Sequence, residues 1–201
     1  MLTGRFISAT PMPLPALARR PWRMGQTTSW SMKSSKPLIT VREIALFGVL
    51  GGLTFAAKLV MSGLPNIEPV SLMVMLFAVT FGRKCIYPLY VYVAMEILVY
   101  GINIWNVYYL YVWLVLAVAA YFMRNNRESL LWAILSAAFG LAFGALCGIT
   151  DIFVLGGIAP AVAKWISGIM FDVIHCVSNF IIALLLFKPL RELMEKLYKK
   201  I

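Results

Sequence analysis

The sequence predicts an all-α membrane protein, a bundle of six transmembrane helices with both termini in the cytoplasm. Of its 201 residues, 62% are hydrophobic and only 13% are charged, which is more apolar sequence than a soluble domain of this length can bury. The apolar residues form continuous runs rather than an alternating pattern, which favours helices over a β-barrel. Most charged residues lie beside these runs rather than inside them.

Six apolar runs are the predicted spans, at residues 44–64, 69–81, 85–101, 107–123, 130–149 and 165–187. The second run is the shortest, with 13 residues. At about 1.5 Å rise per residue it does not cross a hydrocarbon layer of about 30 Å. It must therefore include residues 66–68 or end below the outer membrane surface.

The basic residues predict the orientation. With the N-terminus in the cytoplasm, 16 of the 18 Lys and Arg residues lie inside, and only Lys58 and Lys164 do not. This is the distribution that the positive-inside rule describes, and an even number of spans returns the C-terminus to the cytoplasm. The net charge of +10 therefore indicates a membrane surface rather than nucleic acid as the partner.

Two terminal segments flank the predicted transmembrane domain, residues 43–188. Residues 1–42 contain no acidic residue and are rich in Arg, Ser, Thr and Pro, which predicts a disordered basic tail. A start of translation further downstream, for example at Met32, and an organelle transit peptide are the alternatives. Residues 189–201 begin with Pro189 and predict an amphipathic helix on the cytoplasmic surface, or else a solvated continuation of the last span. Its apolar face would hold Leu190, Leu193, Met194, Leu197 and Ile201.

Small residues recur every four positions in two spans, and such faces let helices approach closely. The first span has Gly48, Gly52 and Ala56, and the fifth has Ser136, Gly140, Gly144 and Gly148. We expect one face to pack inside the bundle and the other to dock a partner subunit. The sequence does not distinguish the two assignments.

Polar residues collect in the outer halves of the spans and in the outer links. A charge at membrane depth costs about 2.5–3.5 kcal/mol, so this concentration predicts a cavity that binds a solute. Asp172, His175 and Asn179 are spaced three and four apart and share one helix face. A structural role, in which Asp172 pairs with His175 or Lys58, is the alternative. The predicted binding residues are Lys58, Asn66, Glu68, Glu96, Asn103, Trp105, Asn106, Tyr109, Asp151, Lys164, Asp172, His175 and Asn179.

The segment NIWNVYYLYVW, residues 103–113, adds an aromatic cluster to this region. Part of it fits an interfacial belt, and the remainder offers faces on which a ring-containing solute can stack. The chain contains no GxxxxGK[ST], HExxH or GxSxG motif, and its three cysteines lack metal-type spacing. We therefore expect no cofactor, no metal and no enzymatic activity, and uphill transport would require an ATPase partner.

Four stretches between residues 42 and 190 resemble bacterial S components, the substrate-binding subunits of energy-coupling factor (ECF) vitamin importers: LPNIEPVSL, FGRK, YVYVAMEILVYG and NVYYLYVW. The resemblance implies a bacterial cell-membrane protein that binds a vitamin or cofactor precursor, with cobalamin- and queuosine-type solutes as candidates. It also implies docking to a transmembrane coupling subunit and two cytoplasmic ATPases. The family's AxxxA-type docking motif matches the spacing of Gly48, Gly52 and Ala56. Its solute-capping loops correspond to Asn66, Glu68, Asn103, Trp105, Asn106 and Asp151.

Two other classes of protein remain open from the sequence. An intramembrane enzyme would use Asp172, His175 and Glu96 as acid and base groups. A stand-alone proton-coupled transporter would use Glu96 or Asp172 as its proton relay. Neither requires ATPase partners, whereas an S component does.

Overall fold

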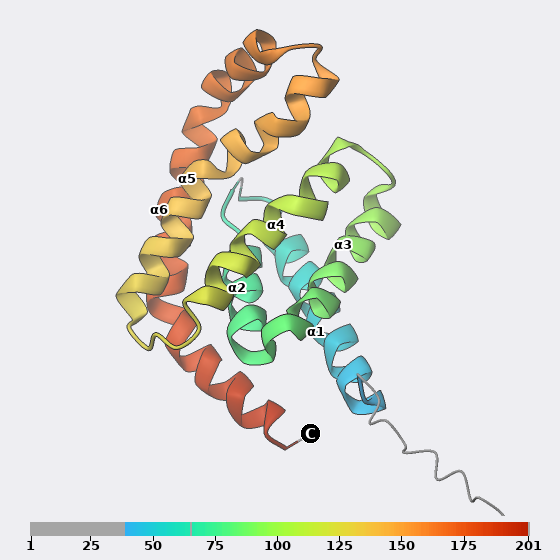
Figure 1. Ribbon diagram of the computed structural model, residues 1–201, viewed down its shortest axis with the longest axis vertical. Helices are drawn as coiled ribbons and strands as arrows, with labels where there is room; N and C mark the ends of the chain where they lie inside the picture. The colour runs from blue at the N-terminus through green and yellow to red at the C-terminus, as the bar shows by residue number, and fades with distance from the viewer. Residues whose placement is uncertain (1–38, 65, 201) are drawn as a thin grey trace, which may run out of the picture. The chain divides into compact units, whose positions relative to one another are not determined.

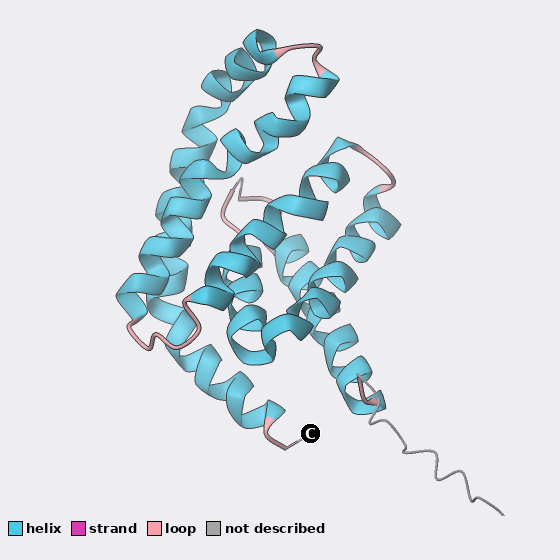
Figure 2. Cartoon of the chain, viewed as in Figure 1, coloured by secondary structure: helices cyan, strands magenta, loops and turns pink. Residues whose placement is uncertain are grey.

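The fold is described from a computed structural model of the chain, which covers residues 39–64 and 66–200. Most of the predicted basic tail, residues 1–38, lies outside the described residues, as does Ile201. The elements are α1 (Val41–Val60), α2 (Val70–Phe81), the 3₁₀ helix η1 (Gly82–Cys85), α3 (Ile86–Tyr100), α4 (Ile104–Phe122), α5 (Ser129–Val154) and α6 (Ile158–Tyr198). Figure 2 shows helices joined by short loops throughout the described part.

Five helical segments are long and apolar enough to cross a membrane: Val41–Val60, Val70–Tyr100, Ile104–Phe122, Ser129–Val154 and Ile158–Tyr198. The chain is therefore a multi-pass membrane protein by helix length and hydropathy, and the all-α prediction is confirmed for the part described. The number of spans and the side on which the termini lie stay predictions.

The segment Val70–Tyr100 reverses direction at Gly82, where α2 ends. Gly82 has a φ of 59°, which a side chain would make unfavourable, and η1 completes the turn into α3 (Figure 1). With 12 residues, α2 is about 18 Å long at 1.5 Å per residue. It is buried along almost its whole length, from Val70 to Phe81, and packs against α4 and α6. A central position among other helices explains why this short run is apolar on all sides.

The two faces of small residues have different environments. In α5, a Cβ atom on Gly140 would lie 2.8 Å from the backbone carbonyl of His175 in α6, so that face is an internal contact. In α1, a Cβ atom on Gly48 or Gly52 would have no atom of another described element within 4 Å. The neighbouring Gly51 faces the bundle instead, where a Cβ atom would lie 2.6 Å from the Val91 side chain of α3. The face of Gly48 and Gly52 is thus the free one.

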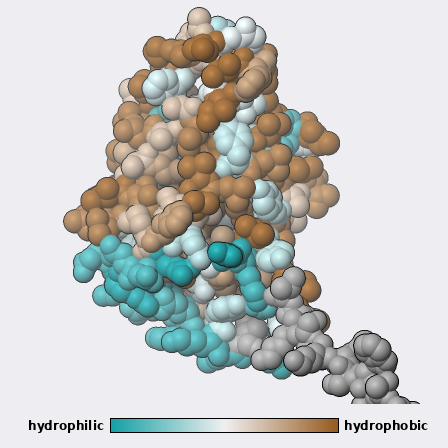
Figure 3. Space-filling view, in the orientation of Figure 1, coloured by the Kyte–Doolittle hydropathy of each residue, from teal (hydrophilic) through white to brown (hydrophobic). Residues whose placement is uncertain are grey.

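Basic residues collect at one end of the bundle, which we call the basic end. The turn at η1, the loop between α4 and α5, and the last turns of α6 all lie there (Figure 1). In Figure 3 the hydrophilic surface is concentrated at this end, below a mainly apolar surface. The basic residues of these segments, with one in the first turn of α1, are Arg42, Arg83, Lys84, Arg124, Arg127, Lys188, Arg191, Lys196, Lys199 and Lys200.

The predicted amphipathic helix is the last part of α6, which continues through Pro189 to Tyr198. Its buried residues are Arg191 and Met194, and the ring of Tyr198 packs edge-on against Phe81 at 4.9 Å. The predicted apolar face is only partly used for packing inside the protein, because Leu193 is exposed. The charged residue Arg191 is buried in its place.

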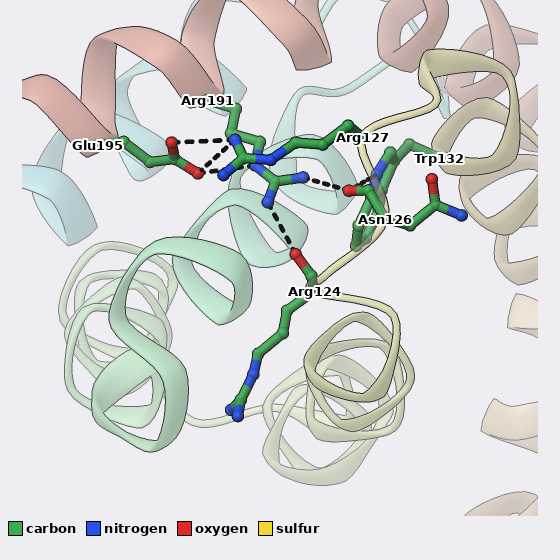
Figure 4. Close-up of polar contacts among 6 residues, drawn as sticks. All are labelled: Arg124, Asn126, Arg127, Trp132, Arg191 and Glu195. Atoms are coloured by element: carbon green, nitrogen blue, oxygen red, sulfur yellow. Dashed lines mark hydrogen bonds and ion pairs between the residues drawn. The ribbon is translucent and has the colours of Figure 1, made fainter.

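The buried Arg191 fastens α6 to the loop between α4 and α5 (Figure 4). Its guanidinium donates to the carbonyl oxygens of Arg124 at 2.7 Å and Asn126 at 2.5 Å, and to Glu195 at 2.9 Å. Glu195 also accepts from Arg127 at 2.9 Å. These bonds involve all three guanidinium nitrogens of Arg191, so this polar cluster has a structural role.

Candidate functional site: a divided polar cavity

Two adjoining cavities lie at the end of the bundle opposite the basic end, with volumes of about 410 and 370 Å³. Each is within the size range of small-molecule sites, about 300–1,000 Å³. Asn66, Trp105 and Phe143 line both cavities and mark their boundary. The walls come from the ends of α1, α3 and α5, the starts of α4 and α6, and the loop after α1.

The first cavity, which we call the Glu68 cavity, is built around Lys58 in the last turn of α1. The Lys58 ammonium lies 2.9 Å from Glu96 Oε1 in α3. It donates to the hydroxyl groups of Tyr109 at 2.9 Å and Tyr92 at 3.3 Å. The ion pair offsets the cost of placing both charges at membrane depth. Glu68 also lines this cavity. It takes part neither in this ion pair nor in the hydrogen bonds between Lys58 and the tyrosines.

The second cavity, which we call the Asp172 cavity, contains a similar ion pair. Lys164 Nζ lies 2.7 Å from Asp151 Oδ1, and the Tyr108 hydroxyl donates to the same oxygen at 2.5 Å. Asp172 accepts from the backbone amide of Gly144 at 3.0 Å and from Trp165 Nε1 at 3.1 Å. Both donors are neutral, so this carboxylate is held in place but not neutralised.

Asparagines shape the boundary of the cavities. Asn103 caps α4 by accepting from Trp105 N at 2.9 Å, and Asn106 accepts from Asn103 N at 2.7 Å, which fixes the start of α4 where Trp105 lies. Asn66 has a φ of 57°, a conformation that Asn tolerates better than most residues. Its carbonyl oxygen accepts from Ser178 at 2.8 Å, which attaches the loop to α6.

The structure brings together most of the predicted binding residues. The Glu68 cavity is lined by Lys58, Asn66, Glu68, Glu96, Asn103, Trp105, Asn106 and Tyr109. The Asp172 cavity is lined by Asn66, Trp105, Asp151, Lys164 and Asp172.

His175 and Asn179 do not line either cavity, and their placement corrects the prediction that they would. His175 packs against the ring of Phe143 at 5.0 Å. Asn179 donates to Ser71 Oγ at 3.0 Å and to Ser136 O at 3.2 Å in the interior. The shared helix face was predicted correctly, but only its outer turn reaches the cavity. The next two turns of that face pack against α5 and α2.

Several lining residues were missed by the sequence reasoning. Trp165 lies seven residues before Asp172, on the same helix face, and Gly144 lies on the small-residue face of α5. Tyr108 belongs to the aromatic cluster but was not among the predicted binding residues. No sequence signal marked Phe143, because a phenylalanine in an apolar helix is ordinary.

The ionisable groups of the site are distributed over both cavities. Within the described residues no group of three His, Cys, Asp or Glu side chains is arranged to hold a metal ion. The three groups considered for acid–base chemistry are not gathered at one place: Glu96 lines one cavity, Asp172 the other, and His175 neither. Glu68 lies in the loop after α1, outside the helices. Its burial raises its pKa to about 6; the charge of Lys58 lowers this pKa and the charge of Glu96 raises it. Glu68 is therefore mainly ionised at neutral pH.

The fold and the site define a multi-pass helical membrane protein with a divided, polar and aromatic-lined cavity at one end. Comparison with known protein families, curated proteins and solved structures finds no match to the chain.

Proposed function

We propose that this protein is the substrate-binding S component of an ECF-type importer in a bacterial cell membrane. Its cavity would bind a vitamin or cofactor precursor from outside. The observation that carries the proposal is a cavity of small-molecule size that is lined by charged and aromatic side chains and lies at the end of the bundle opposite the basic end. By the positive-inside rule this end faces the exterior, where an imported solute is first bound.

The interior below the cavities supports a binding subunit that depends on a partner. Trp113, Met75 and Leu76 are fully buried, and they belong to a continuous apolar core. Protein cores are packed as densely as organic crystals, so a polar solute does not cross this core without a large rearrangement. Movement of the whole subunit against a coupling subunit would release the solute without such a path.

The free face of α1 is the proposed docking surface for the coupling subunit. Gly48, Gly52 and Ala56 lie on it, and no atom of the described chain is close to the positions that Cβ atoms would occupy at the two glycines. Close approach of small residues is a common means of helix association in membranes. The comparable face of α5 is already used by α6.

Affinity purification of the tagged chain from its native membranes tests the proposal. We expect a transmembrane coupling subunit and two ATPase subunits to co-purify. Gly52→Leu should abolish this assembly and leave the purified chain folded, because it fills only the free face. Gly51→Leu is the matched control, which should destabilise the chain itself through its contact with Val91.

Recovery of the chain without ATPases would contradict the proposal. Retention of the complete assembly in Gly52→Leu would contradict the docking surface but not the S-component assignment. In that case another exposed face would be the contact with the coupling subunit.

A further inference from the structure

The charges that line the two cavities do not balance. In the Glu68 cavity, Lys58 is paired with Glu96, and Glu68 is a second carboxylate. In the Asp172 cavity, Lys164 is paired with Asp151. Each cavity therefore contains one ion pair and one further acid, and the two together have an excess of two negative charges when all the acids are ionised.

The extra acid of the second cavity, Asp172, is well buried. Only 5% of the residue is exposed, and its hydrogen bonds come from a backbone amide and an indole, which carry no charge. Lys164 does not reach it, because the ammonium is 2.7 Å from Asp151 instead. A buried carboxylate without a cation is costly, and a positively charged ligand group would offset that cost.

The aromatic residues at the boundary favour the same kind of ligand. Trp105 and Phe143 line both cavities, and Trp105 is 53% exposed, so part of its ring is free for contact. The faces of aromatic rings attract cations, tryptophan most strongly. The protein itself uses this interaction nearby, where the Lys58 ammonium lies 4.7 Å from the centroid of Tyr109.

We propose that the solute is a ring-containing organic cation, with its positive group against Asp172, its ring at Trp105 and Phe143, and a hydrogen-bond donor towards Glu68. This inference rests on the proposed role of the cavities as a solute-binding site. It does not depend on the proposed ATPase partners. It also narrows the sequence-based expectation, in which charges of both signs were available to the solute. Lys58 and Lys164 form ion pairs with acids of the protein itself. The two remaining charged groups of the cavities, Glu68 and Asp172, are both negative.

Three probes with one ring and different charges test this inference: 1-methylnicotinamide is a cation, nicotinamide is neutral and nicotinate is an anion. Thermal unfolding of the detergent-purified chain, followed over a series of probe concentrations, gives an apparent affinity for each. We expect the cation to bind at least about tenfold more tightly than the neutral probe, because only the cation brings a positive charge to the unneutralised Asp172 carboxylate and to the aromatic rings. The anion should bind most weakly.

Variants assign the preference to the cavities. Asp172→Asn should reduce the affinity for the cation about tenfold and leave that for nicotinamide unchanged. Glu68→Gln should reduce the affinity for the cation by a larger factor than that for nicotinamide, because only the cation is also attracted by the negative charge of Glu68. Glu192→Gln is the matched control, because Glu192 is an exposed acid of α6 far along the chain from the cavity. If Asp172→Asn does not fold, Glu68→Gln still decides, since among the described residues no hydrogen bond is made by the Glu68 side chain.

Equal or tighter binding of nicotinamide or nicotinate would overturn the inference. So would the absence of stabilisation by all three probes, or an equal loss of affinity in Glu192→Gln. None of these results bears on whether ATPases co-purify with the chain. Conversely, a chain that purifies without ATPases and still prefers the cation would contradict the proposed function alone.

Discussion

Three glycines on one face of α5 provide a graded test of the packing between α5 and α6. An added Cβ atom at Gly140 would lie 2.8 Å from the backbone of His175, and one at Gly144 would lie 2.5 Å from the Asp172 carboxylate. An added Cβ atom at Gly148 would meet no neighbouring side chain or helix within 4 Å in the part of the chain that the structure describes. Substitution by alanine is the same chemical change at each position, so only the environment differs.

The expected free energies follow from these contacts. Overpacking costs about 1–3 kcal/mol, and the upper end applies at Gly140, because a backbone carbonyl cannot rotate away. Replacing a helical glycine by alanine gains up to about 1 kcal/mol. Gly140→Ala should therefore lower the free energy of unfolding by about 2 kcal/mol, and Gly148→Ala should raise it by up to about 1 kcal/mol. Gly144→Ala should have a small effect on stability, because the Asp172 side chain can move.

Binding should respond in a different order from stability. Displacing Asp172 weakens its hydrogen bond to the Gly144 amide and moves the carboxylate within the cavity, so Gly144→Ala should lose about tenfold in affinity for a cationic probe. Denaturant-induced unfolding of the three purified variants, together with probe titration, measures both quantities. If Gly148→Ala were as destabilising as Gly140→Ala, the close contact of α5 with α6 would not be the cause of the loss, and the reasoning would fail.

Three further predictions concern charge and orientation. Because the pKa of Glu68 is raised to about 6, cation binding should weaken as the pH falls through 6. In the ligand-free protein the free energy of unfolding should fall as the pH rises from about 4.5, the ordinary pKa of Glu, to about 6, because the buried Glu68 side chain favours its protonated form. A titration of Glu68→Gln should show neither change. Arg191→Ala should lower the free energy of unfolding by about 2–4 kcal/mol, because two loop carbonyls lose their donors. Arg127→Ala, which removes an exposed side chain, should lower it by at most about 1 kcal/mol. Chemical unfolding of the two variants measures the difference. A cysteine introduced at Ile102 should react with an impermeant maleimide from outside the cell, and one at Asn125 should react only after permeabilisation; the reverse pattern would refute the predicted topology.

The sequence alone predicted a helical membrane protein and the region in which the two cavities lie. The apolar runs determine a helical membrane protein, because backbone groups in lipid must be satisfied within each segment. The charges at membrane depth indicated the site, because each one costs enough free energy to require a partner. For that reason most of the predicted binding residues, among them Lys58, Glu96 and Asp172, line the cavities.

Only the tertiary structure decided which residues meet. Helical spacing places Asp172 and Asn179 on one face, but spacing does not say at which turn that face passes from the cavity into the interface with α5 and α2. The pairing of Lys58 with Glu96 and of Lys164 with Asp151 likewise depends on the distances between helices. Those distances result from packing around residues such as Gly140, where an added methyl group would have no room. The unpaired negative charge of the cavity follows from these pairings, so it could not be deduced from the composition, in which basic residues outnumber acidic ones.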